Sequence, residues 1–376
     1  MKFLLKFYVF ILNIVYFFLK LMPTKKNKIL FLSRQTDKAS IDFRMLISEI
    51  QKNHPEYSII VITKRIEKKL TDVAIKEIPV IFSQMYHLAT SNICVIDGYN
   101  IPISVLRHKK DLKVIQIWHS LGAIKKFGYQ SLTTDKDKLI AECLCMHKNY
   151  DYIISGSNSM IPYFKEAFGY SDEAFLPIGL PRVDYLLTKG NFNRNKIYSK
   201  HPELKNKKII LYAPTFRNNK NYKIDELINS IDLEKYFLIV KLHPNIKYSI
   251  NPKNVYLCES FTTLQLLSVA DYVITDYSAI SIEASILNIP IYLYVYDYDE
   301  YKKNPGININ LYDEFPGYVF QDPSELYKRL SKDEYDFGVV KKYKKKYTTY
   351  LDKKVTKRLA DFIVNIKKST DYEENL

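Results

Sequence analysis

Glycine is scarce in this chain, with 10 residues among 376. That scarcity argues against a fibrous or low-complexity protein. Tyrosine and phenylalanine are instead abundant, at 32 and 20 residues, and aliphatic runs recur along the chain. Because the length exceeds the usual domain size of roughly 100–200 residues, we expect two domains, each with its own hydrophobic core.

Cysteine is also rare, and its four positions show no paired framework. Cys143 and Cys145 are one residue apart and His147 follows, but a zinc site needs a fourth ligand and usually a C-x₂₋₄-C spacing. We therefore expect no metal site. Cys94, Cys258 and the other thiols are expected to be reduced and packed in the core of a protein on the cytoplasmic side.

The familiar glycine-rich nucleotide motifs are missing. The chain has neither a G-x-G-x-x-G fingerprint nor a G-x-x-x-x-G-K-[ST] loop. Their absence argues against a dinucleotide-dependent dehydrogenase and against a P-loop nucleotidase. Any nucleotide would have to be held by other groups.

Positive charge is concentrated at the two ends of the chain. The formal net charge is +15, of which residues 1–28 carry +6 and residues 339–358 carry +8, leaving +1 for everything else. A nearly neutral body argues against nucleic acid as a partner, since nucleic-acid binding proteins spread basic side chains over the binding face. The basic ends suggest an anionic membrane surface instead.

The first basic stretch encloses an apolar and aromatic segment, FLLKFYVFILNIVYFFLKLM, which Lys6, Asn13 and Lys20 interrupt. It has no small-residue cleavage site, so we do not expect a signal peptide. We predict that residues 1–27 form a membrane-associating helix that lies on an anionic leaflet. A transmembrane span and a helix packed on the protein body are the alternatives.

After this segment, continuous apolar strands alternate with helices in two successive series. Such runs are typical of parallel sheets covered on both faces, so we predict an α/β protein with two doubly wound domains. Pro and Gly cluster at 177–187, which predicts the junction there. The expected domains are 28–178 and 179–338, followed by a basic helix and tail at 339–376. Among the smaller elements, IPVIF at 78–82 is expected to be a strand.

Ligands of open parallel sheets bind outside the carboxyl ends of the strands, so residues at those ends are the site candidates. In the first domain VIQIWH ends in His119, and Lys125 and Lys126 follow in the next loop. In the second domain two strands end at Arg217 and His243. Histidine suits proton transfer near neutral pH, and lysine and arginine suit a phosphate. A single strand-end histidine is often structural, but one in each domain beside cations favours catalysis.

A third strand of the second domain, DYVIT, runs into Asp276, Tyr277 and Ser278 and then into a helix. Asp276 and Ser278 suit N-capping, and the amides of the first helical turn could bind an anion. Asp276 would repel a phosphate, so we expect it to orient the turn or a histidine. Tyr277, Ser278 and the amides would then face the ligand. An ordinary cap with nothing bound is the alternative.

The motifs IWHSLGAIKKFG, GLPRVDY, ILYAPTFR, KLHP and DYVITDYSAISIEASILNIPIYLYVYD occur in this order. Together they resemble the CDP-glycerol glycerophosphotransferase family of wall teichoic acid synthesis, over roughly residues 28–330. The resemblance implies a GT-B-type fold, with two Rossmann-like domains facing a cleft. It also implies transfer of a polyol phosphate from a CDP-activated donor, without metal or cofactor, at the cytoplasmic face of the cell membrane.

The resemblance also implies roles for individual residues. His119 matches the general base that activates the acceptor hydroxyl. His243 and the 276–278 turn match the donor diphosphate site, where Arg217 would contact a phosphate. Glu283 matches, more loosely, a position that holds a nucleotide ribose.

Within the family, WHSLGAIKKFG is more similar to the glycerol-phosphate primases than to the polymerases, which typically read WHGTPLKK. The expected reaction is transfer of glycerol phosphate from CDP-glycerol to a polyprenyl-diphosphate-linked disaccharide. A short polymerase, a CDP-ribitol enzyme and a nucleotide-sugar glycosyltransferase of the same fold are alternatives. A non-catalytic binder of anionic lipid or nucleic acid would leave the strand-end residues unexplained.

Overall fold

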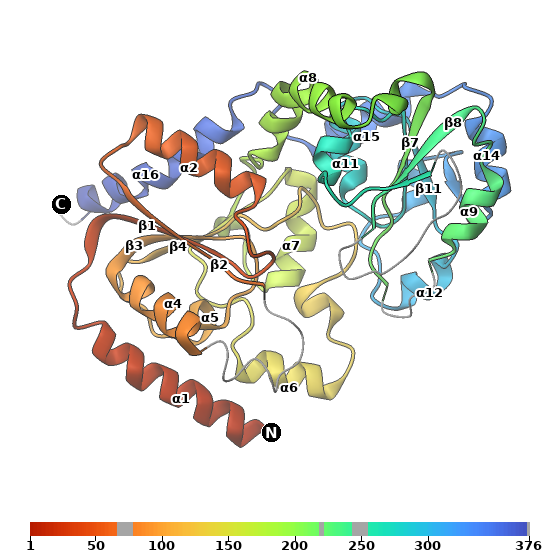
Figure 1. Cartoon of the computed structure of the whole chain (residues 1–376). Coiled ribbons are helices and arrows are strands. Elements are labelled where there is room, and N and C mark those ends of the chain that lie inside the picture. The colour runs from red at the N-terminus through yellow and green to blue at the C-terminus, as the bar shows by residue number, and fades with distance from the viewer. Residues whose placement is uncertain (66–77, 218–221, 243–254, 374–376) are drawn as a thin grey trace. The chain divides into compact units, whose positions relative to one another are not determined.

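The computed structural model describes residues 1–65, 78–217, 222–242 and 255–373, the last of these with side chains up to Ile366. The chain divides into two compact units (Figure 1). Unit 1 comprises residues 1–120, 127–182 and 354–376, and unit 2 comprises residues 121–126 and 183–353. The sequence IEKKLTDVAIK predicts a further helix at residues 66–76, which lie outside the described residues.

Unit 1 contains a six-stranded sheet in the order β2-β1-β3-β4-β5-β6, in which every pairing is parallel. The strands are β1 (Lys25–Ser33), β2 (Ser58–Thr63), β3 (Ser91–Ile96), β4 (Lys113–Gln116), β5 (Tyr152–Ile154) and β6 (Phe175–Leu176). The helices are α1 (Lys2–Leu19), α2 (Ile41–Asn53), α4 (Ile78–Thr90), α5 (Ile101–Val105), α6 (Asp135–Cys143), α7 (Ile161–Phe168) and α16 (Val355–Glu373). Helices α2 and α16 cover one face of the sheet, and α4 and α5 cover the other (Figure 1).

Unit 2 contains a second six-stranded parallel sheet, in the order β12-β11-β10-β7-β8-β9. Its strands are β7 (Lys208–Tyr212), β8 (Tyr236–Val240), β9 (Val255–Leu257), β10 (Tyr272–Thr275), β11 (Ile291–Tyr294) and β12 (Val319–Phe320). Its helices are α8 (Arg182–Lys200), which begins at the boundary, α9 (Ile224–Ser230), α10 (Thr263–Leu266), α11 (Ile280–Ile286), α12 (Tyr298–Lys303), α13 (Leu311–Glu314), α14 (Pro323–Leu330) and α15 (Phe337–Tyr347).

Both sheets have the sequence character expected of strands that are covered on both faces. The central strands β1, β3, β7 and β10 are almost entirely buried along their apolar runs. Continuous burial accounts for the absence of an apolar–polar alternation in these runs. The predicted α/β class with two parallel sheets is confirmed.

Two predicted elements are wrong. Residues 78–82 are not a strand but the first turns of α4, where Ile78 and Phe82 are 59% and 50% exposed. Pro79 fits there because the first helical turn needs no amide donor. The basic C-terminal helix is also not continuous: α15 ends at Tyr347 in unit 2, and α16 begins at Val355 in unit 1, where it packs on α2.

The N-terminal helix α1 packs against α4, α5 and α6 of unit 1. Leu12 and Tyr16 are buried on its inner side, whereas Phe3, Phe10 and Phe17 are exposed on the other. The helix is long and apolar enough to cross a membrane by length and composition. A span would require these contacts with unit 1 to break.

Candidate active site

The chain turns sharply after β4 and presents His119. The strand ends at Gln116, and Trp118 adopts a left-handed backbone with φ +57°. This conformation costs a side chain such as tryptophan about 1–2 kcal/mol. Gln116 supports the turn: its Oε1 accepts a hydrogen bond from the Trp118 amide at 2.8 Å, and its Nε2 donates to the Gly98 carbonyl at 3.2 Å.

His119 is exposed and held by a backbone contact. Its Nδ1 lies 2.9 Å from the carbonyl oxygen of Asp97, at the end of β3, and its ring lies 4.1 Å from that of Trp118. Because a carbonyl oxygen only accepts hydrogen bonds, Nδ1 carries the proton in this contact. The lone pair of the neutral imidazole therefore belongs to Nε2, which is the arrangement that a general base needs.

An aromatic cluster fixes Trp118 and thereby the turn. The Trp118 ring stacks on Phe127 at 4.5 Å between centroids, and Phe168 of α7 meets it edge-on at 5.2 Å. His147 packs on Phe168 at 4.7 Å and hydrogen-bonds the Tyr150 hydroxyl through Nδ1 at 3.1 Å. Burial lowers the pKa of His147 to about 3. His147 is therefore a neutral member of this cluster near neutral pH.

The Asp97 side chain is almost completely buried at the same strand end. Only 1% of the residue is exposed, and burial raises the pKa of its carboxyl to about 7. Nearby, Arg182 binds the buried Asp42 carboxylate through Nε at 2.9 Å and through its amide at 2.8 Å. This pair ties the GLPR motif to the start of α2.

In unit 2, Arg217 lies at the centre of a buried ionic cluster. Its Nε donates to Asp297 Oδ2 at 2.6 Å, its Nη2 to Asp297 Oδ1 at 3.0 Å, and its Nη1 to Asp276 Oδ2 at 2.8 Å and to the Thr215 carbonyl at 2.9 Å. The guanidinium also lies 4.6 Å from the centroid of the Tyr296 ring. Four of its five N–H groups are thus engaged within unit 2.

Asp276 orients a turn, as predicted. Its carboxylate accepts hydrogen bonds from the Thr215 amide at 2.9 Å and from the Thr215 hydroxyl at 2.6 Å, in addition to that from Arg217. The end of β10 is therefore joined to the loop after β7. Arg217 offsets the negative charge of this buried carboxylate, which would otherwise repel a phosphate.

The prediction that the Tyr277 side chain faces a ligand is wrong, because Tyr277 is fully buried. Its hydroxyl donates to Asp297 Oδ1 at 3.0 Å, and its ring stacks on Tyr301 at 3.8 Å. The predicted capping is also wrong. Helix α11 begins at Ile280, with Ala279 at the N-cap position and no side-chain cap. Ser278 is half-buried, and its Oγ accepts only a long 3.4 Å hydrogen bond from the Ile280 amide.

The two remaining candidates in this domain are Glu283 and His243. Glu283 lies on α11 with 5% of its surface exposed, and its charge raises the pKa of Tyr343, although burial is the larger cause of that shift. Little of Glu283 is presented to a ligand, so its ribose contact stays a prediction. His243 lies outside the described residues, directly after β8 and Leu242.

Lys125 and Lys126 belong to unit 2, although the predicted boundaries placed them in the first domain. The Lys126 amide donates to the Gly306 carbonyl at 2.9 Å, and the Asn308 amide donates to the Ile124 carbonyl at 2.7 Å. Lys125 is exposed. Desolvation lowers the pKa of the Lys125 ammonium. The charge of Asp276 raises this pKa, and the charge of Arg217 lowers it.

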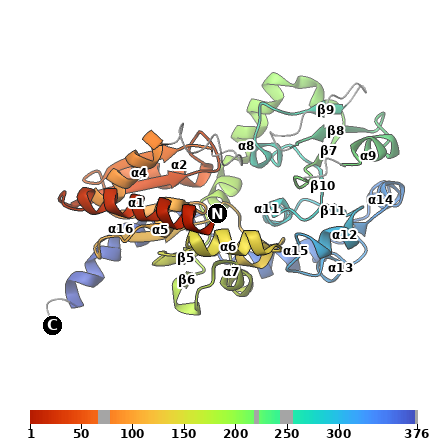
Figure 2. The same ribbon diagram turned by 90° about the horizontal axis from the view of Figure 1, so that it is seen from below.

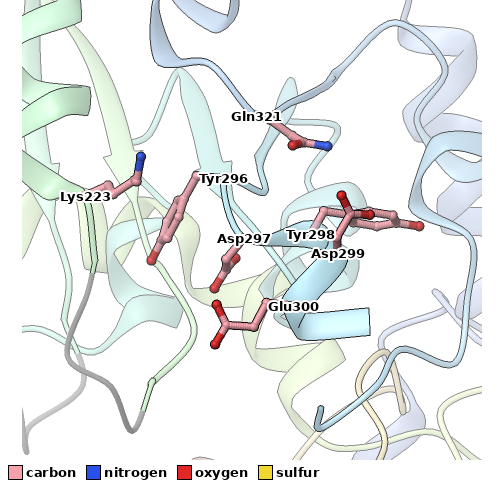
Figure 3. Close-up of a pocket in the computed structure, with 7 residues that line it drawn as sticks. All are labelled: Lys223, Tyr296, Asp297, Tyr298, Asp299, Glu300 and Gln321. Carbon is pink, nitrogen blue, oxygen red and sulfur yellow. The ribbon is translucent and has the colours of Figure 1, made fainter. Parts of the chain in front are cut away.

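A pocket of about 330 Å³ lies beside the Arg217 cluster (Figure 3). Lys223 and Tyr296 stand on one side of it, and the Asp297 and Glu300 carboxylates point toward each other. Asp299 adds a third carboxylate. Carboxylate oxygens accept hydrogen bonds, so the pocket suits a hydroxyl-bearing ligand group rather than a phosphate. Among the described residues, no group of three or more His, Cys, Asp and Glu side chains is placed to hold a metal ion.

Comparison with known proteins decides the family. The family described as CDP-Glycerol:Poly(glycerophosphate) glycerophosphotransferase matches residues 14–365. This chain belongs to that family. The teichoic acid ribitol-phosphate primase of Bacillus spizizenii is 30% identical over 91% of this chain and 92% of the relative. The teichoic acid glycerol-phosphate primase of Bacillus subtilis is 34% identical over 75% of this chain and 76% of the relative.

Solved structures agree with the fold. The wall teichoic acid polymerase TagF has a TM-score of 0.72 and 22% identity, over 98% of this chain and 97% of the other. The UDP complex of S. aureus MnaA has a TM-score of 0.59 and 12% identity, over 92% and 97%. The family match and the primase relatives confirm the predicted resemblance, and this glycerophosphotransferase-family chain is a phosphotransferase of teichoic acid synthesis.

Several residues that support the candidate positions in the two units were not predicted from the sequence. Asp97 and Asp297 each follow a strand directly, in ICVID and IYLYVYD, so the rule of strand carboxyl ends could have found both. Gln116 carries no such signal, because its role is a contact with the backbone of its own turn. The Asp42–Arg182 pair joins residues 140 positions apart, which no local pattern indicates.

Proposed function

We propose that this protein transfers glycerol phosphate from CDP-glycerol to a membrane lipid, ManNAc-GlcNAc-diphospho-undecaprenol, and releases CMP. The reaction would serve wall teichoic acid or a related surface polymer, at the cytoplasmic face of the cell membrane. Membership of the glycerophosphotransferase family and the glycerol-phosphate primase relatives support the donor and the reaction class. The acceptor rests on the resemblance of the WHSLGAIKKFG motif to the primases.

The observation that carries the proposal is the geometry of His119. The Asp97 carbonyl engages Nδ1 at 2.9 Å, so Nε2 holds the lone pair that can take a proton. In the proposed step, a hydroxyl of the acceptor attacks the phosphorus that bears glycerol, and Nε2 takes the hydroxyl proton. A new P–O bond forms, the P–O bond to CMP breaks, and CMP leaves with the electron pair.

The donor diphosphate needs positive charge, because negative charge grows on the leaving CMP. Arg217 is an unsuitable direct contact, since four of its N–H groups already bind Asp276, Asp297 and a carbonyl. We assign that role to the exposed Lys125, whose charge interacts with those of Asp276 and Arg217, and to the exposed Lys126 that follows it. Arg217 then acts by holding the strand ends and cancelling the charge of Asp276. The contribution of His243 to the donor site remains a prediction.

CDP-ribitol is a second candidate donor, and a specific observation favours it. The relative that aligns over 91% of this chain is a ribitol-phosphate primase. Ribitol carries more hydroxyl groups than glycerol, and the pocket lined by Asp297, Asp299 and Glu300 offers acceptors for them. The same chemistry at His119 would serve either donor.

The test is CMP release by purified protein supplied with CDP-glycerol or CDP-ribitol and a lipid-linked ManNAc-GlcNAc acceptor analogue. Product mass is read from the same reactions. One added glycerol phosphate supports the proposed primase, a ladder of products indicates a polymerase, and turnover with CDP-ribitol alone changes the donor. Silence with both donors, combined with UDP release from a nucleotide sugar, would replace the proposal with a glycosyltransferase. Reactions without acceptor control for simple hydrolysis.

A further inference from the structure

A cavity of about 760 Å³ lies at the edge of the unit 1 sheet opposite to the site described above. Its walls are residues 104–110 and 112, which lead from α5 toward β4, residues 145 and 148–151, which precede β5, and Val9 and Asn13 of α1. These connections precede β4 and β5, so they lie at the amino ends of the parallel strands. His119 follows the carboxyl end of β4, so the cavity is not part of the proposed active site.

The cavity is strongly basic. Arg107, Lys109, Lys110 and Lys148 line it, against the single acid Asp151, which itself pairs with Lys113 at 3.6 Å. The side chains of Arg107, Lys110 and Lys148 are exposed. Within the described part of the chain, none of the three has a side-chain hydrogen bond or ion pair. Three cationic groups in one cavity without a protein counter-ion favour an anionic ligand.

The cavity also has a rigid wall, which α1 provides. Asn13 Nδ2 donates to the Val105 carbonyl at 3.0 Å, and Asn13 Oδ1 accepts from the Arg107 amide at 3.1 Å. The Tyr16 hydroxyl lies 3.0 Å from His108 Nδ1, and His108 Nε2 lies 2.8 Å from the Ile103 carbonyl. Burial lowers the pKa of His108 to about 4, so this ring is neutral at physiological pH. The basic loop and α1 therefore form one structural unit.

The outer face of α1 is apolar, and unit 1 does not cover it. Figures 1 and 2 show α1 as an outermost element of unit 1, outside α4 and α5. Its exposed large side chains follow a helical spacing along one stripe: Phe3, Phe7, Phe10, Ile14, Phe17 and Leu21. Lys20, at the end of the helix, donates to the Arg107 carbonyl at 2.8 Å, so the stripe and the cavity are adjacent. An apolar face beside a cationic cavity has the two chemistries of a lipid surface.

We propose that this cavity binds the phosphate headgroup of an anionic membrane phospholipid, while the exposed face of α1 lies among the acyl chains. Arg107, Lys110 and Lys148 contact the phosphate oxygens, and Phe10, Phe17 and their neighbours enter the bilayer. A free phosphate would use only the cavity and would leave the apolar stripe in water. A phospholipid accounts for both, and it holds α1 parallel to the membrane plane. The site is independent of the reaction proposed above.

The test measures binding of the full chain to phosphatidylcholine vesicles with and without phosphatidylglycerol, by flotation. Each basic residue near an anionic surface contributes about 1 kcal/mol, so Arg107→Gln with Lys148→Gln should weaken partitioning about 30-fold. The matched control is Arg44→Gln with Lys52→Gln, which removes the same charge from exposed positions on α2, the helix on the opposite face of the sheet. The control should bind as the unchanged protein does.

A second variant separates a headgroup site from general surface attraction. Val9→Phe fills space inside the cavity and leaves the charge unchanged, so it should reduce binding of soluble dihexanoyl-phosphatidylglycerol at least tenfold, as measured by calorimetry. Val9→Ala should retain binding. Unchanged lipid binding in Val9→Phe, or equal losses in the two charge variants, would overturn the proposal. Inorganic phosphate that competes as strongly as the lipid would instead indicate a free-anion site and would also overturn it.

Discussion

Arg217 donates two hydrogen bonds to the Asp297 carboxylate, with Nε–Oδ2 and Nη2–Oδ1 distances of 2.6 and 3.0 Å, although the residues are 80 positions apart. A bidentate pair of this kind fixes both side chains in one plane. Asp297 also accepts a hydrogen bond from the Tyr277 hydroxyl. The ends of β7, β10 and β11 are therefore held together by one cationic group, and the adjacent pocket takes its geometry from that group.

Asp297→Asn should destabilise unit 2 by about 3 kcal/mol, because it leaves a buried guanidinium with one carboxylate in place of two. Urea unfolding followed by circular dichroism measures the change in the free energy of unfolding. Asp299→Asn is the control, since it makes the same chemical change at an exposed position in the same pocket and should alter stability by less than about 0.5 kcal/mol. Equal effects would refute the structural role of Asp297.

His119→Ala should reduce the rate of CMP release by about 100- to 10,000-fold, the range that loss of a general base produces. Because the His119 side chain is exposed, the thermal midpoint should stay within a few degrees. His54→Ala, at a half-buried histidine at the end of α2 in the same unit, should retain full turnover. Persistent CMP release in His119→Ala would remove this residue from the mechanism.

The sheets and several site positions could be predicted because their causes are local. Continuous apolar runs indicate buried parallel strands, and the carboxyl ends of those strands place His119 and Arg217 among the candidates. The prediction of a strand at residues 78–82 was wrong. Their β-branched residues favour strands, but the packing of α4 on unit 1 outweighs that preference. Strand propensity does not decide the structure of a segment that can bury one face of an amphipathic helix.

The orientation of site residues could not be predicted, because it depends on partners distant in sequence. Arg217 binds Asp276 and Asp297, which lie 59 and 80 positions further on, and its phosphate contact stays a prediction. Tyr277 is buried for the same reason. The position of Lys125 in unit 2 depends on contacts with residues 306–308, which no local pattern indicates.

Asp97 should make the stability of unit 1 fall as pH rises. Its pKa is about 7 in the folded chain, where burial is the main cause, and about 3.9 in an unfolded chain. Between these values the unfolded state has lost the proton that the folded state keeps, so stability decreases over this window and levels off above pH 7. Asp97→Asn removes the ionisation while preserving shape.

The measurement for Asp97 is the unfolding free energy of both proteins from pH 4 to pH 9. Near pH 4 the two should be similar, and at pH 8 Asp97→Asn should be more stable by up to about 4 kcal/mol. The comparison cancels the titration of other groups, since they are common to both proteins. A constant difference across the whole range would contradict a raised pKa for Asp97.

Replacing Gly128 with alanine should destabilise the protein, whereas replacing Gly190 with alanine should stabilise it. Gly128 follows Phe127, has φ +57°, and a Cβ there would lie 2.3 Å from the Ala167 carbonyl oxygen of α7. Gly128→Ala must push the loop away from α7, which disturbs the stack of Phe127 on Trp118 and hence the His119 turn. We expect a loss of about 2–3 kcal/mol in stability together with a loss of CMP release.

Gly190 provides the matched substitution, because it lies inside α8 and a Cβ added there would meet no atom within 4 Å. Gly190→Ala should stabilise the protein by about 0.5–1 kcal/mol, since alanine lowers the backbone entropy lost in a helix. The thermal midpoint of unfolding and the rate of CMP release are measured for both variants. If Gly128→Ala were as stable and active as Gly190→Ala, the turn that presents His119 would not depend on the close approach of residue 128 to α7.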